Sequence, residues 1–472
     1  MGTRVKVNVA IARLAALFLI LYALLALRQG WVQVVAGPRI AADRHDPRVA
    51  LLAPYRGDIL ARDGTVLARS TERGREYPLG RALAQTVGYL STRYGTAGLE
   101  AAFDARLSPR PAGNGPADQL RSILAGKASS AVRGESVVTT LDPEIQTALF
   151  DALSAYPRAA GIALDPRTGE VLAIASVPSF DPANIDAAFP SLHADDASPL
   201  FNRALQGLYP PGSSFKIVTA ANALEDGVVT PESTFNDNGA LTVGTVVFHN
   251  DENEATGVQD LAGAFALSSN VDFGRIALEI GVDRWFEGVA RWGMDAAPDF
   301  ELPAARDRLP LRAEVTPSIL AQLGFGQADL LVTPLRMGLV GATIAAGGTE
   351  PQPFMVRSFR SADGREVYAA HGGAPLRPIS AAVADQVRTL MLAVVERGTG
   401  RAAALHGVEV AGKTGTATLA TGTAHAWFVA FAPADAPRVA VAIVVEHGGY
   451  GGAAAAPIAR RVLATALRRI KS

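Results

Sequence analysis

Several residue types that would support common chemistries are missing or scarce in this chain. It has no cysteine, which excludes disulfides, thiolate catalysis and cysteine-ligated zinc. Its 472 residues include 44 lysines and arginines against 45 aspartates and glutamates, so the net charge is close to zero. A chain without an excess of positive charge is not expected to bind nucleic acid. The histidines have no metal-ligand spacing and no dinucleotide-binding fingerprint is present, so neither a metal nor a cofactor is predicted.

Lysine is scarce as well. Only five lysines occur, and two of them, Lys216 and Lys413, lie inside motifs of small and polar residues. An arginine keeps its proton near neutral pH, whereas a buried lysine amine can become neutral and take a proton from a hydroxyl. This contrast suggests that lysine is kept for positions where an arginine could not do the same chemistry.

Long apolar runs are absent except near the N-terminus. Residues 7–27 are apolar apart from Asn8 and Arg13, and basic residues flank them. About 20 helical residues cross the hydrocarbon core of a bilayer, and a basic tail favours a cytoplasmic N-terminus. Because no small-residue cleavage site follows, an uncleaved anchor is favoured over a signal peptide. We therefore expect a cytoplasmic tail at 1–6, a single transmembrane anchor at 7–27 and an extracytoplasmic remainder.

Proline, glycine and small polar residues divide the remainder in two. They are concentrated at 109–116 and 126–134, so the domain boundary is predicted near residue 134. Residues 28–134 then form a small, loop-rich N-terminal module that contains a hairpin turning at Asp63-Gly64. Residues 135–472 form the larger domain.

The larger domain mixes strands with helices. Strand patterns occur at 136–140, 161–176, 354–359, 408–417, 427–432 and 439–445. Asp142 can cap a helix, and helical spacing of apolar residues occurs at 213–225, 261–281, 334–346 and 458–470. Strands at both ends of the domain, with helices enclosed between them, predict an α+β fold.

The most informative motif begins at Ser213. The preceding Tyr209-Pro210-Pro211-Gly212 cannot continue a regular element, so a helix is expected to start at Ser213. Lys216 then projects from the same face one turn later, and the positive end of the helix dipole favours an alkoxide on Ser213. A neutral Lys216 can activate this serine where no histidine base is available. Alone, such a Ser-x-x-Lys motif is a weak signal.

Two further motifs strengthen this interpretation. Ser268-Ser269-Asn270 lies within a helical pattern and supplies a second hydroxyl and an amide. Lys413-Thr414-Gly415-Thr416 lies on a predicted strand, where Gly415 permits close approach of an extended substrate. The edge of that strand offers N–H groups for an oxyanion hole and for pairing with a peptide. Three such motifs in this order predict a catalytic site.

The trio resembles the S-x-x-K, S-D-N and K-T-G signatures of the penicillin-recognising serine transferases, with Ser-Ser-Asn in the middle position. Together with the anchor, wider matches make the chain similar to class B, monofunctional penicillin-binding proteins: Arg56-Gly57-Asp58-Ile59, Asp63-Gly64, Tyr209-Pro210-Pro211-Gly212, Gly324-Phe325-Gly326-Gln327, Thr333-Pro334 and His425-Ala426-Trp427-Phe428. The resemblance implies an antiparallel sheet with a helical subdomain, placed after a transmembrane anchor and a small pedestal or dimerisation-like module at 28–134. It also implies a bacterial cytoplasmic-membrane protein.

The resemblance further implies a mechanism. Ser213 attacks the D-Ala-D-Ala carbonyl of a peptidoglycan stem peptide, D-Ala leaves, and an amine of a second stem peptide resolves the acyl-enzyme. Lys216 is the base, Ser268 and Asn270 move protons and position substrate, and Lys413 supplies positive charge. The substrate-binding residues are Thr414, Gly415 and Thr416. β-Lactams are the implied inhibitors, and a SEDS-type glycosyltransferase is the implied membrane partner.

Other functions remain open from the sequence alone. A D,D-carboxypeptidase forms the same acyl-enzyme but passes it to water. A class D type β-lactamase or a penicillin sensor shares two of the motifs, although the N-terminal module and the Ser-Ser-Asn triplet argue against both. A non-catalytic scaffold that activates a SEDS-type polymerase is the alternative outside enzymology.

Overall fold

The computed structural model describes residues 14, 16–25, 28, 56–108, 110–111, 131–369, 375–419 and 422–470. Within these ranges residues 16–25 are helical and exposed. No helix of the described residues is both long enough and apolar enough to cross a membrane. The predicted tail at 1–6 and part of the predicted anchor at 7–27 lie outside the described residues.

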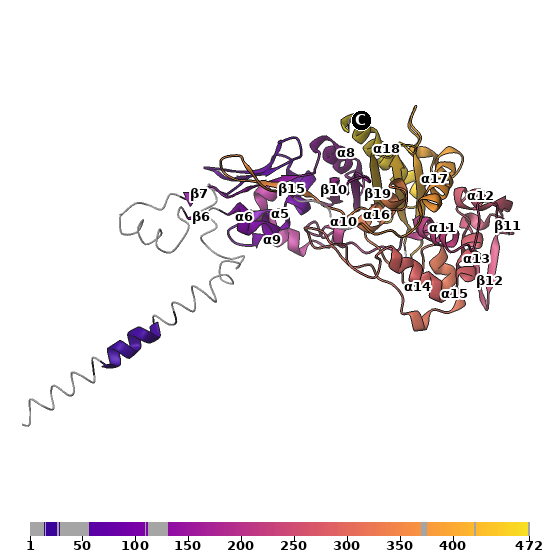
Figure 1. Cartoon of the computed structure of the whole chain (residues 1–472), viewed down its shortest axis with the longest axis horizontal. Coiled ribbons are helices and arrows are strands. Elements are labelled where there is room, and N and C mark those ends of the chain that lie inside the picture. Colours follow the sequence, from indigo (N-terminus) through magenta and orange to yellow (C-terminus); the bar gives the residue numbers. More distant parts are fainter. Residues whose placement is uncertain are drawn as a thin grey trace, which may run out of the picture.

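A five-stranded antiparallel sheet forms the centre of the larger domain (Figure 1). Its strand order is β10 (Val171–Val177), β9 (Ala159–Leu164), β19 (Val439–Val445), β18 (His425–Ala432) and β17 (Ala411–Ala417). Strands from the beginning and the end of the domain are thus neighbours, which confirms the α+β prediction. In this order β17 is an outer strand, because β18 is its only neighbour in the sheet formed by the described residues.

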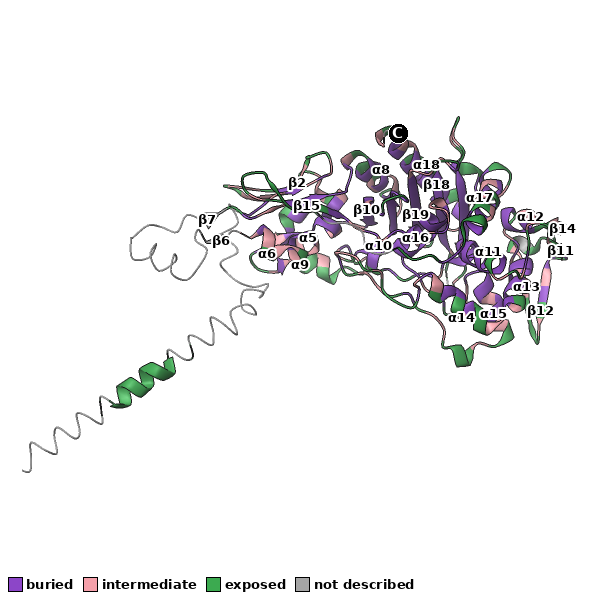
Figure 2. Ribbon diagram, in the orientation of Figure 1, coloured by how far each residue is buried: buried purple, intermediate pink, exposed green. Residues whose placement is uncertain are grey.

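Helices cover both faces of this sheet, and its middle strand β19 is therefore apolar and buried along its whole length. In β19, Val441 and Ile443 belong to the core shared with α8 (Pro143–Leu153) and α18 (Gly451–Arg469). The alternate residues Ala442 and Val444 belong to the opposite core, which includes α16 (Pro334–Ala345). Successive side chains on a strand point to opposite faces, and Figure 2 shows both layers as buried.

A second sheet extends the molecule toward the N-terminal module (Figure 1). Its strand order is β16 (Glu366–Ala369), β15 (Val356–Arg360), β8 (Ser136–Thr139), β1 (Ile59–Leu60), β2 (Val66–Thr71) and β3 (Gly74–Glu76). The hairpin predicted at Asp63-Gly64 is confirmed, since β1 pairs antiparallel with β2. Strands from both sides of residue 134 share this sheet. The domain boundary near that residue stays a prediction.

Short elements complete the N-terminal module and the first connections of the larger domain. They are α4 (Ala84–Val87), β4 (Leu90–Ser91), β5 (Gly95–Thr96), α5 (Gly98–Ala102), α6 (Asp104–Leu107), β6 (Arg110–Pro111), β7 (Ala131–Val132), α9 (Ile185–Ala194) and α10 (Arg203–Gln206). Short 3₁₀ turns occur at Gly80–Leu83, Pro182–Asn184, Asp251–Asn253, Arg312–Glu314 and Arg401–Ala403.

A helical region lies at the end of the molecule opposite the N-terminal sheet (Figure 1). Its helices are α11 (Lys216–Glu225), α12 (Leu261–Ala266), α13 (Asn270–Ile280), α14 (Val282–Arg291), α15 (Pro317–Gly324) and α17 (Ala381–Glu396). Two hairpin-like pairs accompany them, β11 (Thr234–Asp237) with β14 (Gly257–Asp260) and β12 (Ala240–Val243) with β13 (Val246–His249). This region and β17 enclose the predicted site.

The structure corrects the prediction of one helical pattern through 261–281. The chain breaks between α12 and α13, where Ser268 adopts a left-handed backbone with φ +62°. Ser269 then caps α13, because its hydroxyl accepts the backbone N–H of Asp272 at 3.0 Å. Cap formation at Ser269 therefore starts a new helix at Asn270 and leaves Ser268 in a turn.

Candidate active site

Ser213 lies in a single 3₁₀ turn, Gly212–Phe215, that runs directly into α11. Gly212 has φ +54°, and a Cβ there would come within 2.5 Å of the carbonyl oxygen of Thr416. The turn is also fixed by the Gly212 N–H, which donates to Gly326 O at 2.9 Å. Ser213 is thus held against β17 and is 8% exposed.

Lys216 follows one turn later and is fully buried. Its Nζ donates to Ser268 O at 2.6 Å and to Asn270 Oδ1 at 2.9 Å, and Ser268 Oγ lies 3.2 Å away. Burial, and then the like charge of Lys413, lower the pKa of Lys216 well below its ordinary value. A neutral amine has two N–H groups, which Ser268 O and Asn270 Oδ1 accept, so its lone pair is free to accept a proton.

Lys413 reaches the same hydroxyl from β17. Its Nζ donates to Ser268 Oγ at 2.9 Å and to Thr414 O at 3.1 Å. Burial lowers the pKa of Lys413 to about 7, although Asp251 opposes the shift. Ser268 Oγ therefore lies between two buried amines whose pKa values are both depressed. Such a hydroxyl can pass a proton from one group to the next.

Two aromatic rings form an apolar floor under the lysines. Lys216 Nζ is 5.5 Å from the ring centre of Phe273, and Lys413 Nζ is 5.6 Å from that of Phe265. The two rings are 5.9 Å apart and fully buried. They keep water from the amines. Sequence reasoning missed this floor, although each ring stands three residues from the Ser268-Ser269-Asn270 triplet.

The Lys413-Thr414-Gly415-Thr416 segment lies on the outer strand β17, as predicted. A Cβ on Gly415 would lie 2.8 Å from Pro211 O and 3.1 Å from Ser214 Cβ, so only glycine lets β17 approach the Ser213 turn this closely. The hydroxyl of Thr414 contacts that of Thr399 at 2.5 Å. Thr399 is exposed in a loop for which the sequence predicted no role.

The structure brings all the predicted residues into one region. Lys216, Ser268, Asn270 and Lys413 are joined by hydrogen bonds, while Ser213, Gly415 and Thr416 meet through the packing of the Gly212 turn on β17. Thr414 continues that strand. The catalytic and binding roles of these residues are taken up as proposals below.

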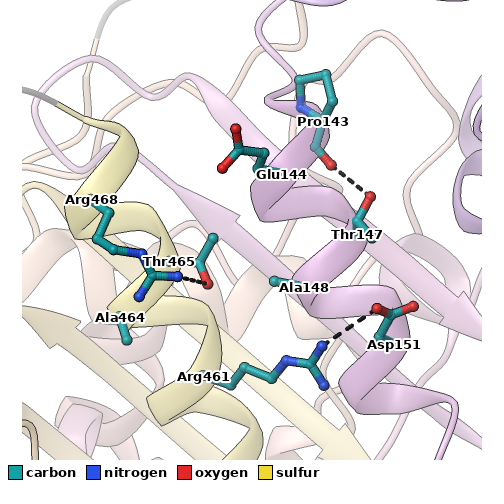
Figure 3. A pocket seen from close by; sticks show the side chains of 9 residues that line it. All are labelled: Pro143, Glu144, Thr147, Ala148, Asp151, Arg461, Ala464, Thr465 and Arg468. Atoms are coloured by element: carbon teal, nitrogen blue, oxygen red, sulfur yellow. Dashed lines mark hydrogen bonds and ion pairs between the residues drawn. The ribbon is translucent and has the colours of Figure 1, made fainter.

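The structure also has a surface groove away from this site, and the residues that line it are not suited to the same chemistry. It has a volume of about 560 Å³ and lies between α8 and α18 (Figure 3). Its arginines already have partners, since Arg461 pairs with Asp151 at 3.4 Å and Arg468 donates to Thr465 Oγ1 at 3.1 Å. None of its lining residues belongs to the Ser213 site. The residues that line the groove include neither a lysine nor a serine.

Two features define the class of penicillin-recognising serine transferases. They are the central sheet with its helical region, and the two buried lysines that share Ser268 Oγ. Family models agree. One described as "Penicillin binding protein transpeptidase domain" matches residues 159–464, and one described as "Penicillin binding protein A dimerisation domain" matches residues 56–137. The chain belongs to the penicillin-binding proteins, within their class B.

Individual relatives match over nearly the whole chain. Peptidoglycan D,D-transpeptidase PbpA of Mycolicibacterium smegmatis is 35% identical, over 98% of this chain and 99% of that protein. The ceftriaxone acyl-enzyme complex of penicillin-binding protein A from M. tuberculosis has a TM-score of 0.81 at 33% identity, covering 89% of this chain and 100% of that one. A D,D-transpeptidase domain from Eggerthella lenta has a TM-score of 0.79 at 36% identity, covering 88% and 99%.

Proposed function

We propose that this chain cross-links peptidoglycan stem peptides by D,D-transpeptidation through a serine acyl-enzyme. The observation that carries the proposal is the shared contact of two buried amines with Ser268 Oγ, beside the turn that holds Ser213. Relatives named as D,D-transpeptidases, and the penicillin G acyl-enzyme of penicillin-binding protein A from M. tuberculosis, support it. β-Lactams are accordingly inhibitors of this chain.

In the first half-reaction, Ser213 Oγ attacks the carbonyl carbon of the penultimate D-Ala. Its proton passes to neutral Lys216, and the resulting oxyanion is held by the backbone N–H groups of Ser213 and Thr416. The C–N bond to the terminal D-Ala then breaks, and its nitrogen takes a proton from Ser268, which Lys216 replaces. D-Ala leaves as a free amine that carries its original amide proton and the one received from Ser268, and an ester on Ser213 remains.

In the second half-reaction, the amine of a neighbouring stem peptide attacks the ester. Ser268 and Lys216 accept the proton that this amine loses, the bond between the acyl carbon and Ser213 Oγ breaks, and the proton passes to Oγ, which restores the Ser213 hydroxyl. Asn270 positions the peptide, and before D-Ala leaves, Thr414 and Thr416 bind the terminal carboxylate of the donor beside Lys413. Gly415 leaves room for the extended donor along β17.

The cellular setting belongs to the same proposal. The apolar run at 7–27 anchors the chain once in the bacterial cytoplasmic membrane, with the catalytic domain outside the cytoplasm. A SEDS-type glycosyltransferase is the partner expected in that membrane. Residues 28–134 serve as the pedestal, and residues 135–472 as the transpeptidase domain.

Product analysis tests whether the acyl-enzyme passes its acyl group to an amine or to water. The full-length chain in detergent is given a pentapeptide donor with and without an added amine acceptor, beside Ser213→Ala. We expect a cross-linked product and released D-Ala from the wild type, and neither from the variant. Release of D-Ala with hydrolysed donor alone would indicate a D,D-carboxypeptidase. A Ser213→Ala allele that fully replaced the wild type in cells would favour the scaffold role.

A further inference from the structure

The hydrogen bonds behind the Ser268 turn converge on one carboxylate, that of Asp237. Asp237 is the last residue of β11 and has no exposed surface. Its Oδ1 accepts the backbone N–H of Gly239 at 2.7 Å. Its Oδ2 accepts three side-chain donors: Asn250 Nδ2 at 2.6 Å, Thr256 Oγ1 at 2.7 Å and Ser269 Oγ at 2.8 Å.

This carboxylate is ionised despite its burial. Burial opposes ionisation, but the hydrogen bonds from Thr256, Gly239, Ser269 and Asn250 outweigh it and lower the pKa of Asp237. An ionised carboxylate only accepts hydrogen bonds, so each of these donors turns its hydrogen toward Asp237.

Two of these donors hold the beginning of α13. Ser269 Oγ accepts the N–H of Asp272 as the N-cap. Asn250 Oδ1 accepts the first two backbone N–H groups of α13, at 2.8 and 3.2 Å. Because Asp237 takes the donor hydrogens of Ser269 and Asn250, their oxygen atoms face the helix. The Asp237 carboxylate thus orients both side chains, Ser269 and Asn250, that cap the beginning of α13.

The beginning of α13 in turn carries the atoms that hold Lys216. Ser268 contributes its carbonyl and hydroxyl oxygens, and Asn270 contributes Oδ1. Ser268 adopts φ +62°, a conformation that persists only where the surroundings fix it. A shift of the two caps would move all three of these oxygen atoms relative to Lys216.

We propose that Asp237 is a positioning residue for acyl transfer: through Ser269 and Asn250 it holds Ser268 and Asn270 in place around Lys216. This inference rests on the proposed function and adds a residue to its machinery. Asp237 acts indirectly, because two of its four hydrogen bonds go to Ser269 and Asn250, the side chains that cap α13 beside the Ser268 turn.

Two variants break the arrangement in different ways. Asp237→Asn keeps the size but replaces an acceptor oxygen with an N–H donor, so either orientation of the amide sets it against an existing donor. Ser269→Ala removes one link only and leaves the carboxylate. Glu301→Gln is the matched control, since the Glu301 carboxylate also accepts only uncharged donors, here the backbone N–H groups of Met355 and Val356 at the N-terminal sheet.

The experiment has a structural and a kinetic readout on the full-length chain in detergent. Hydrogen exchange of the peptide spanning 266–273 reports the start of α13, and stopped-flow acylation by penicillin G separates its binding constant from its acylation rate constant. In both Asp237→Asn and Ser269→Ala we expect faster hydrogen exchange at 266–273 and an acylation rate constant lower by about 10- to 100-fold. The binding constant for penicillin G should change less than the rate constant. Glu301→Gln should match the wild type in both.

A pH profile separates positioning from general destabilisation. The Asp237 charge raises the pKa of Lys216, as do the charges of Asp251 and Asp272, while Lys413 lowers it. Asp237→Asn should therefore move the acid limb of the acylation profile to lower pH, since Lys216 becomes neutral more easily. Ser269→Ala keeps the charge and should leave that limb in place.

Defined results would overturn the inference. Unchanged exchange at 266–273, or an acylation rate constant within twofold of the wild type in either folded variant, would remove the positioning role. If Asp237→Asn fails to fold, Ser269→Ala decides by the same two readouts. A wild type that penicillin G does not acylate would refute the proposed function instead, and the exchange data would still show whether Asp237 holds α13.

Discussion

Lys216 and Lys413 share one hydroxyl: their Nζ atoms lie 3.2 and 2.9 Å from Ser268 Oγ. One lysine comes from α11 and the other from β17, so this contact joins the helical region to the edge of the sheet. Two like charges so close are costly in a buried site, which favours a neutral amine on one of them.

Lys216→Arg should keep the fold and abolish acylation. A guanidinium remains protonated, so it cannot accept the Ser213 proton. We expect the acylation rate constant for penicillin to fall by roughly 100- to 10,000-fold, the range of a lost general base. Stopped-flow acylation and a thermal melt measure both properties. A folded variant that acylates at the wild-type rate would exclude Lys216 as the base.

Lys413→Met should shift the pH dependence of acylation. The charge of Lys413 lowers the pKa of Lys216, so its removal raises that pKa. Lys216 then stays protonated to higher pH, and the acid limb of the acylation profile moves upward. Arg397→Met, which removes an exposed cation, is the control and should leave the limb unchanged. An acid limb that stays fixed in Lys413→Met would disprove the coupling.

Gly212→Ala should be destabilising because of its backbone and its neighbours. Residue 212 has φ +54°, and its Cβ would lie 2.5 Å from Thr416 O. A left-handed residue with a side chain costs about 1–3 kcal/mol before any clash is counted. Chemical unfolding should show a loss of at least that size, together with slower acylation. Gly227→Ala, with φ +66° and open space around it, isolates the backbone contribution.

A buried ion cluster away from the active site predicts how stability varies with pH. Arg336 pairs with Asp307 at 2.7 Å and with Glu350 at 3.2 Å. Burial raises the pKa of Asp307 to about 6 and that of Glu350 to about 7, although Arg336 opposes both shifts. The folded state therefore binds these protons more tightly than the unfolded chain does. The free energy of unfolding should fall as pH rises from about 4 to 7.

Glu350→Gln tests this cluster because it removes one of the two raised carboxyl groups. The variant should lose much of the pH dependence of stability between about pH 4.5 and 7, measured by urea unfolding at several pH values. Glu396→Gln, an exposed carboxylate at the end of α17, should keep the wild-type dependence. Equal slopes for all three proteins would show that Glu350 titrates normally.

Much of the site was visible in the sequence because its chemistry uses scarce residues in short motifs. In the structure Lys216 and Lys413 both contact Ser268 Oγ, and Gly415 lies where a side chain would collide with the turn that holds Ser213. The α+β fold followed from strands at both ends of the domain. Each of these signals lies within a short stretch of sequence, so it can be read before the fold is known.

The rest depends on long-range contacts or on weak local signals. The apolar spacing of 261–281 continues across the break at Ser268, and a serine cap such as Ser269 is too common a signal to mark it. Strand β15 joins the sheet of the N-terminal module by pairing with β8, more than 200 residues away in the chain. The hydrogen bond from Ser269 Oγ to Asp237 on β11 likewise joins residues that are distant in the sequence and meet only after folding.

Intact-mass and gel analysis with a fluorescent penicillin tests the central claim most directly. The full-length chain in detergent is incubated with the probe beside a folded Ser213→Ala variant. Opening of the β-lactam ring loses no atoms, so the account predicts one stable adduct of the full probe mass on the wild type and none on the variant. A folded wild type without an adduct, or an equal adduct on Ser213→Ala, would contradict acyl transfer through Ser213.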